Sequence, residues 1–151
     1  MNEAKICPLC EKHANPLETD EFFHCTVCQG IFRSREYHLP PEQEKKRYLE
    51  HDNDVHDAGY RQFVLPITSD ILRTYERSAY GLDFGAGPGP VISEVLQEQG
   101  YNIIKYDPFF SPDTSPLAAM YDFIVCCEVI EHFFSPSSET GRPIVLHDAS
   151  L

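Results

Sequence analysis

The sequence predicts an α/β fold, in which a small cysteine-rich ribbon and a helical connector precede an incomplete parallel sheet. Three observations support this order. Two Cys-x-x-Cys pairs lie within residues 1–36, helix-favouring residues dominate residues 37–79, and residues 80–151 combine short apolar runs with a glycine-rich turn and a helical pattern. Strands that alternate with helices in this way are typical of a parallel sheet. We therefore expect three segments, with the sheet in the last of them.

The composition is that of a globular protein with an acidic surface. The chain has 151 residues, of which 42% are apolar, and its formal net charge is −12. An acidic balance argues against sequence-independent binding to nucleic acid, which needs a basic surface. No apolar stretch reaches membrane-spanning length, and residues 1–9 lack the apolar core of a secretory signal. We expect no membrane association and a cytoplasmic location, where cysteines stay reduced.

The first segment is expected to be built around a metal ion. Cys7 and Cys10 form one Cys-x-x-Cys pair, and Cys25 and Cys28 form the other. Each pair makes a tight turn that directs two thiolates to one point, so two pairs can close a tetrahedral sulfur site, which suits Zn²⁺. Residues 1–36 need such a metal because their core is too small to fold alone. The alternatives are a redox-active cysteine pair and a ribbon that has lost its metal.

Residues 37–79 are expected to form a helical connector, which could serve as a lid over a neighbouring site. The prolines of Leu39-Pro40-Pro41 suit the first turn of a helix, and Glu42–Glu50 favours helix. Tyr60–Tyr75 repeats apolar residues every three to four positions, as a helix with one buried face does. Pro66 is expected either to kink this helix or to mark its first turn.

A glycine-rich turn between a strand and a helix is the most informative feature of the last segment. The run reads Gly81-Leu82-Asp83-Phe84-Gly85-Ala86-Gly87-Pro88-Gly89-Pro90. Its first residues indicate a buried strand, and the apolar residues after it have helical spacing. Such a turn lets a ligand approach the backbone and directs helix N–H groups toward it. The dinucleotide-binding fingerprint needs its third glycine where this chain has Pro90, which disfavours NAD and FAD.

Two further strands are expected after the turn. Tyr101–Asp107 reads as a strand that ends in an acid, and in a strand–helix–strand unit such an acid reaches ribose hydroxyls. Tyr121–Phe133 begins as another strand, contains the adjacent cysteines Cys126 and Cys127, and continues into a Glu-His pair. Neighbouring residues of a strand point to opposite faces, so these two cysteines cannot join one metal site. We interpret them as small residues of a buried strand.

The glycine turn, the acid after the second strand and the later Glu-His pair, taken in this order, resemble class I S-adenosylmethionine (SAM)-dependent methyltransferases that carry a zinc ribbon. The resemblance implies a partial Rossmann-like sheet, SAM as cofactor and methyl transfer to a small or medium-sized molecule. It also implies that Asp83 holds the amino group of SAM through water and that Asp107 binds the ribose. The implied cofactor-binding residues are Asp83, Gly85, Ala86, Gly87, Gly89, Asp107 and Cys127.

The resemblance also makes Glu128, Glu131 and His132 candidate catalytic residues. If a helix begins at Glu128, the three side chains share one face. A similar Glu-x-x-Glu-His arrangement binds Mg²⁺ in metal-dependent O-methyltransferases of quinone biosynthesis, and carboxylates suit that hard cation. The alternative is that His132 only positions or caps a group near the substrate, without Mg²⁺.

The last segment is expected to be incomplete. Between Asp107 and Tyr121 the chain has three prolines and no clear strand, and few residues follow His132. A sheet that stops there leaves an unpaired edge, through which the chain could self-associate. We therefore expect a C-terminally truncated methyltransferase with impaired activity. The alternative is a non-catalytic zinc-ribbon and SAM-binding module, which binding and turnover measurements would distinguish from an enzyme.

Overall fold

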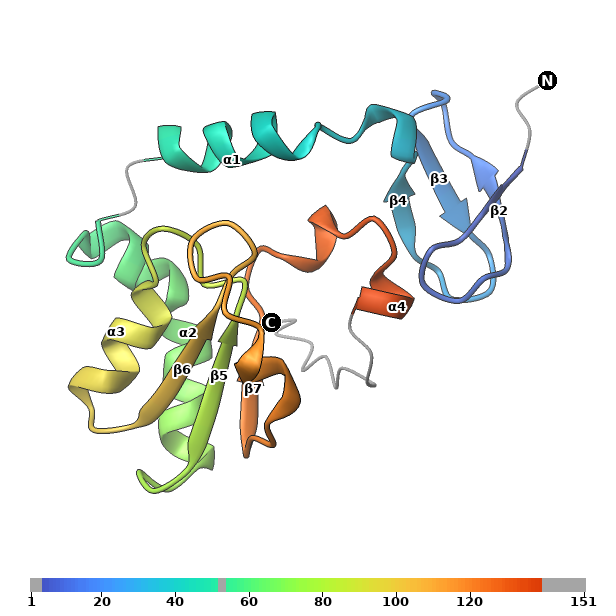
Figure 1. Ribbon diagram of the computed structural model, residues 1–151. Helices are drawn as coiled ribbons and strands as arrows, with labels where there is room; N and C mark the ends of the chain where they lie inside the picture. The colour runs from blue at the N-terminus through green and yellow to red at the C-terminus, as the bar shows by residue number, and fades with distance from the viewer. Residues whose placement is uncertain (1–3, 52–53, 140–151) are drawn as a thin grey trace. The chain divides into compact units, whose positions relative to one another are not determined.

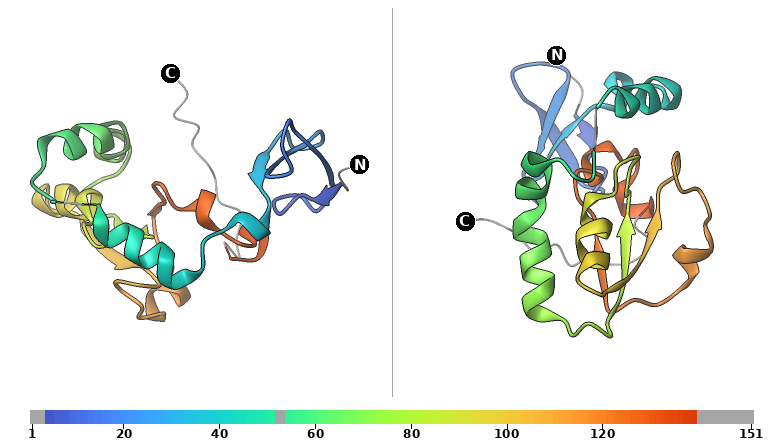
Figure 2. Two further views of the ribbon diagram at one scale, coloured as in Figure 1. Left: turned by 90° about the horizontal axis from the view of Figure 1, so that it is seen from above. Right: turned by 90° about the vertical axis from the view of Figure 1, so that its left-hand side faces the viewer.

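The computed structural model describes residues 4–51 and 54–139 (Figure 1). The chain divides into two compact units, one formed by Met1–Pro40 with Ile130–Leu151 and the other by Pro41–Val129. Each unit has its own hydrophobic core, and Figure 2 shows their helices and strands from two further directions. Within the described ranges, no helix combines the length and the apolar character needed to cross a membrane.

Four short antiparallel strands form the sheet of the first unit. They are β1 (Lys5–Ile6), β2 (His13–Pro16), β3 (Phe22–Cys25) and β4 (Ile31–Arg33), and they lie side by side in that order. Phe23 pairs with Phe32 in the register and stacks on it, with ring centroids 5.8 Å apart. Together with Cys7, Ala14 and Cys25, Phe23 makes a very small core. The unit also contains the 3₁₀ helices η1 (Arg35–Tyr37) and η3 (Ile130–His132) and the short helix α4 (Pro136–Glu139).

The second unit contains a three-stranded parallel sheet. Its strands are β5 (Tyr80–Phe84), β6 (Asn102–Tyr106) and β7 (Phe123–Val125), in the spatial order β6-β5-β7. Its helices are α1 (Pro41–Glu50), α2 (Ala58–Thr74) and α3 (Val91–Glu98), with the 3₁₀ helix η2 (Ser115–Ala118) between β6 and β7. The helices and strands begin within about two residues of the positions expected from the sequence. α2 continues through Pro66, so this proline does not mark the first turn of the helix.

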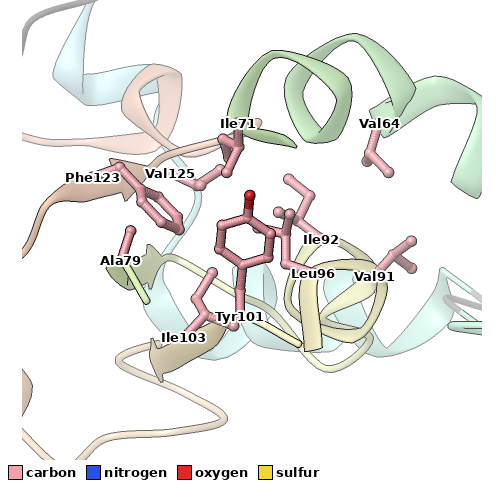
Figure 3. Packing of buried hydrophobic residues seen from close by; sticks show 10 residues of the cluster. All are labelled: Val64, Ile71, Ala79, Val91, Ile92, Leu96, Tyr101, Ile103, Phe123 and Val125. Carbon is pink, nitrogen blue, oxygen red and sulfur yellow. The ribbon is translucent and has the colours of Figure 1, made fainter. Parts of the chain in front are cut away.

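The core of the second unit lies between the sheet and the helices α2 and α3 (Figure 3). It consists of ten buried residues: Val64, Ile71, Ala79, Val91, Ile92, Leu96, Tyr101, Ile103, Phe123 and Val125. The Phe123 ring crosses β5 at Gly81, where an added Cβ would come within 2.3 Å of the ring. Gly81 therefore serves the packing of the sheet and is not available to a ligand.

Helix α2 runs in the opposite direction to the strands. The hydroxyl of Tyr101, which precedes β6, donates to the carbonyl oxygen of Tyr75 at the end of α2, at 2.6 Å. The Tyr75 ring also lies 5.1 Å from that of Phe123, the first residue of β7. The end of α2 is thus at the amino ends of the strands, and its beginning is at their carboxyl ends (Figures 1 and 2). The carboxyl ends are where parallel sheets form their binding sites.

The segment between β6 and β7 adds no strand to the sheet, as its prolines led us to expect. It contains η2 and an isolated bridge between Asp107 and Ser111. In the order β6-β5-β7, β7 pairs with β5 and is an edge strand of the described sheet, where Ile124 is 58% exposed. Self-association through this edge stays a prediction.

Candidate functional site

The four cysteines of the first unit converge on one point. All four sulfur atoms lie within 4.8 Å of one another, with Cys7 Sγ 3.7 Å from Cys28 Sγ and Cys10 Sγ 3.5 Å from Cys25 Sγ. Four thiolates bound tetrahedrally at about 2.3 Å from Zn²⁺ stand roughly 3.8 Å apart, so the spacing fits such an ion. Among the described residues, no other group of three or more histidine, cysteine or acidic side chains comes together in this way. The cluster could therefore hold a metal ion.

The two cysteine pairs are built alike. A residue with positive φ follows each pair: Glu11, with φ of 59°, and Gln29, with φ of 62°. The Cys7 N–H donates to the Lys12 carbonyl oxygen at 2.8 Å, and the Cys25 N–H donates to the Gly30 carbonyl oxygen at 2.9 Å, five residues later in each case. These bonds turn the chain back on itself after each pair, so that the two sulfur atoms of a pair face the same point.

The thiols of the cluster influence one another strongly. The backbone of Cys28 lowers the pKa of the Cys25 thiol, against the effect of burial. The backbone of Gly30 lowers the pKa of the Cys28 thiol, but burial and the neighbouring thiols outweigh this and raise it. A bound cation would favour the charged thiolate form of these cysteines against the effect of burial.

A second candidate site lies at the carboxyl ends of β5 and β6, in Gly85–Gly89, which we call the glycine loop. Gly85 and Gly87 have φ values of 78° and 66°, which glycine adopts without strain. The Gly85 N–H donates to the carbonyl oxygen of Tyr106 at 2.7 Å, and the Gly87 N–H donates to Oδ2 of Asp107 at 2.9 Å. The end of β6 therefore holds the loop in its turned conformation.

The two glycines of positive φ differ in their surroundings. An added Cβ on Gly85 would come within 2.4 Å of the Val129 side chain. An added Cβ on Gly87 would meet no atom within 4 Å. Gly85 is thus required by packing inside the protein, whereas open space lies beside Gly87. A ligand can approach the backbone at Gly87.

Asp107 connects two loops at this edge of the sheet and is only 7% exposed. Its Oδ2 accepts the Gly87 N–H, and its Oδ1 accepts the N–H groups of Phe109 at 2.8 Å and Phe110 at 3.1 Å. An ionised carboxylate has about four lone-pair positions. Asp107 therefore keeps capacity for a further donor while it holds both loops.

Asp83 lies deeper than the glycine loop, on β5, and is 4% exposed. Its Oδ2 accepts a hydrogen bond from the Ser93 hydroxyl, in the first turn of α3, at 2.7 Å. Burial raises the pKa of Asp83 to about 6, and the charge of Asp107 adds to this effect, although Ser93 and Lys105 oppose it. Asp83 thus joins β5 to α3 and acts on the loop through its charge.

Replacing Asp83 by Asn should stabilise the fold in a pH-dependent way. Because the folded-state pKa is raised, the unfolded carboxyl ionises first as the pH rises, and the folded state loses stability between about pH 4 and pH 6. The isosteric Asn cannot ionise, so the variant should gain on the order of 3 kcal/mol over the wild type at pH 7 and little at pH 4. Urea unfolding followed by helical circular dichroism measures both. A difference between the two proteins that does not change with pH would contradict this.

The segment after β7 differs from the expectation. The two adjacent cysteines follow the strand instead of lying within it, and Cys127 is half-buried against the main core. Glu128 is exposed and has a φ of 55°, so the expected helix does not begin there. The helical turn is η3, over Ile130–His132, and it belongs to the first unit. Because Glu128 lies outside this turn, the expectation that Glu128, Glu131 and His132 share one helix face is wrong. Within the turn, Glu131 Oε1 lies 4.0 Å from His132 Nε2.

Tyr60 is a residue of this edge that the sequence analysis missed. It lies in the first turn of α2 and is half-buried against the main core, as Cys127 is. Asp57 caps the helix, since its Oδ1 accepts the Tyr60 N–H at 2.7 Å. An Asp just before a helical pattern is an N-cap signal, and it would have put the beginning of α2 at Ala58.

Comparison with known families adds to this geometry. Residues 56–141, more than half of the chain, match the family model described as "Methyltransferase domain". The matched region includes α2, the glycine loop and all three strands of the parallel sheet. No curated protein and no solved structure matches the chain. On the strength of the match over residues 56–141, the chain belongs to the methyltransferase domain family.

Proposed function

We propose that this protein is a SAM-dependent methyltransferase that acts on a small or medium-sized acceptor. The observation that carries the proposal is the open space beside Gly87, next to the buried carboxylate of Asp107 and inside the region that matches the family. When bound, SAM supplies a methyl group on a positively charged sulfur, which a nucleophile of the acceptor displaces. The protein's part is to position the two reactants and to exclude water.

The residues at the carboxyl ends of the strands suit this cofactor. Asp107 would accept a hydrogen bond from a ribose hydroxyl through its remaining lone-pair position. The negative charge of Asp83, below the loop, would favour the ammonium group of the methionine part. The backbone of Gly85, Ala86, Gly87 and Gly89 would lie along that part, with Cys127 at its border.

Glu128 remains the residue of the second unit proposed for the acceptor, and Glu131 and His132, in the first unit, remain proposed catalytic residues. Glu128 is the exposed acid that follows Cys127, and its proposed role is to accept a proton from the acceptor. Glu131 and His132 form a close pair within η3. The Mg²⁺ proposal depended on one helix carrying all three side chains, and it has no such support here.

The metal is proposed to be structural zinc. Four thiols at the observed sulfur distances fill every position of a tetrahedral ion, which leaves no open position for a substrate or water. The site therefore stabilises the ribbon and takes no part in methyl transfer.

Replacing Asp107 by Ala should weaken SAM binding by on the order of 1–3 kcal/mol, because the ribose hydroxyls lose their acceptor. Isothermal titration calorimetry measures the affinity. Asp70→Ala, which removes an exposed carboxylate from α2, is the control for the charge and should bind as the wild type does. Because Asp107 also holds two loops, urea unfolding of the same variant separates lost binding from lost folding. Unchanged affinity in a folded variant would remove Asp107 from the site.

The proposed function itself is tested by transfer of an isotopically labelled methyl group from SAM to a panel of small acceptors. Transfer with release of S-adenosylhomocysteine supports an enzyme. SAM binding without transfer to any acceptor favours the alternative of a binding module. Binding of NAD in preference to SAM would overturn the proposal.

A further inference from the structure

The beginning of α2 brings Tyr60 to the carboxyl edge of the parallel sheet. α2 runs antiparallel to the strands, so its first turn lies at the edge that carries the glycine loop (Figure 1). Val64, one turn after Tyr60, belongs to the same core as Val91, which begins α3 directly after the loop (Figure 3). Residues one turn apart share a helix face. The Tyr60 side chain therefore lies on the face of α2 that is turned toward the sheet.

The surroundings of Tyr60 are acidic and partly closed. Its ring packs against the main core, as Cys127 does, and it is half-buried. Burial raises the pKa of the Tyr60 hydroxyl, and the charges of Cys127, Asp83 and Glu128 raise it further. These three residues lie at the carboxyl ends of β5 and β7. Tyr60 thus places a protonated hydroxyl, which can donate a hydrogen bond, among acidic groups.

Two contacts fix the first turn of α2 in this place. The Asp57 carboxylate caps the helix at Tyr60. Arg61 donates two hydrogen bonds to the Glu98 carboxylate at the end of α3, at 2.7 and 2.8 Å, and a third to the carbonyl oxygen of Val55 at 2.8 Å. The paired arginine–carboxylate geometry resists rotation as well as separation. Tyr60 is therefore held by rigid elements and not by a loose segment.

We propose that the Tyr60 hydroxyl binds the carboxylate of the methionine part of SAM, and this rests on the proposed function. The methionine part carries an ammonium and a carboxylate. The carboxylates of Asp83 and Glu128 attract the ammonium, but they repel the carboxylate, which needs a neutral or positive donor. Tyr60 lies at this edge with Asp83, Cys127 and Glu128. Its hydroxyl can donate a hydrogen bond and carries no negative charge. The proposed SAM site lies within the region that matches the family, and the assignment of Tyr60 to the carboxylate rests on its position on α2.

The assignment is tested by comparing three ligands in calorimetry. SAM and S-adenosylhomocysteine both carry the amino-acid carboxylate, whereas 5′-methylthioadenosine keeps the nucleoside and a thioether sulfur but lacks the amino-acid part. Tyr60→Phe removes only the hydroxyl. It should weaken SAM and S-adenosylhomocysteine by at least about ten-fold and leave 5′-methylthioadenosine unchanged, because hydrogen bonds to charged groups are the stronger ones. Tyr75→Phe, which removes a hydroxyl at the other end of α2, is the matched control and should change none of the three.

The outcomes distinguish failure of the Tyr60 assignment from failure of the proposed function. Unchanged SAM affinity in Tyr60→Phe, with binding by the wild type, overturns the assignment of Tyr60 and leaves the proposed function standing. Equal weakening of all three ligands also overturns it, because the hydroxyl would then act on the nucleoside or on the helix. A wild-type protein that binds none of the three overturns the proposed function and the assignment with it.

Discussion

Replacing Cys25 by Ser is expected to release the metal and unfold the ribbon of residues 1–36, the largest effect that one substitution should have on this chain. Apart from its four cysteines, the core described for the first unit consists of Ala14, Phe23 and the partly buried Phe32. So small a core does not fold alone, and structural zinc contributes roughly 10 kcal/mol or more in small domains of this kind. We expect one Zn²⁺ per wild-type chain and none in the variant, by elemental analysis of the purified proteins.

The second unit should survive this substitution because the two cores share no residue. Amide signals of β1–β4 should collapse in the NMR spectrum, and those of β5–β7 should keep their positions. Cys126→Ser is the matched control, since it removes a thiol outside the cluster and should retain full zinc content. Zinc retained by Cys25→Ser, or a ribbon that stays folded without any metal, would contradict the structural role.

Replacing Gly85 by Ala should mainly reduce the stability of the fold, whereas replacing Gly87 by Ala should mainly reduce the affinity for SAM. Both positions have positive φ, so both variants carry a backbone cost of about 1–2 kcal/mol. At Gly85 the added Cβ also meets Val129, which should cost about 1–3 kcal/mol more. At Gly87 the Cβ enters open space, so the fold should tolerate it, and the proposed SAM site should lose on the order of ten-fold or more in affinity because the ligand needs that space.

Urea unfolding measures the stability of both variants, and titration with SAM measures their affinity for it. Gly85→Ala combined with Val129→Ala should regain part of the stability, since the double variant removes the collision but not the backbone cost. If Gly87→Ala bound SAM as the wild type does, the open space beside Gly87 would not be the cofactor site. Equal stability of the two single variants would show that Val129 moves aside at little cost.

The strands of the parallel sheet and the helices α1, α2 and α3 could be predicted because local patterns determine them. Short apolar runs predicted β5, β6 and β7, and the two Cys-x-x-Cys pairs predicted the sulfur cluster of the first unit. The glycine loop was recognisable because positive φ selects glycine at Gly85 and Gly87. Such signals act over a few residues and need no knowledge of the tertiary structure.

The remaining features depend on contacts between distant residues. Positive φ is uncommon for glutamate, so the residue type at Glu128 gives no sign of its left-handed backbone. A regular helix was therefore the expectation after β7. The bond from Gly87 to Asp107 and that from Ser93 to Asp83 join different elements. The place of Tyr60 follows from the direction of α2, which the ring of Tyr75 and the hydroxyl of Tyr101 reveal at the opposite edge. Sequence periodicity gives the apolar face of a helix but not its direction relative to a sheet.

The hydrogen bonds inside the glycine loop have a consequence for the choice between adenosine cofactors. The N–H groups of Gly85 and Ala86 donate to the Tyr106 carbonyl oxygen, at 2.7 and 3.1 Å, and that of Gly87 donates to the Asp107 carboxylate. A pyrophosphate needs free N–H donors of this kind, and it brings two negative charges. At this loop it would find its donors engaged and a carboxylate beside it, whereas a sulfonium and an ammonium would be attracted. The loop should therefore discriminate between SAM and a pyrophosphate cofactor by the sign of the ligand's charge more than by its size. Because added salt screens charges, it should reduce the difference between the two affinities.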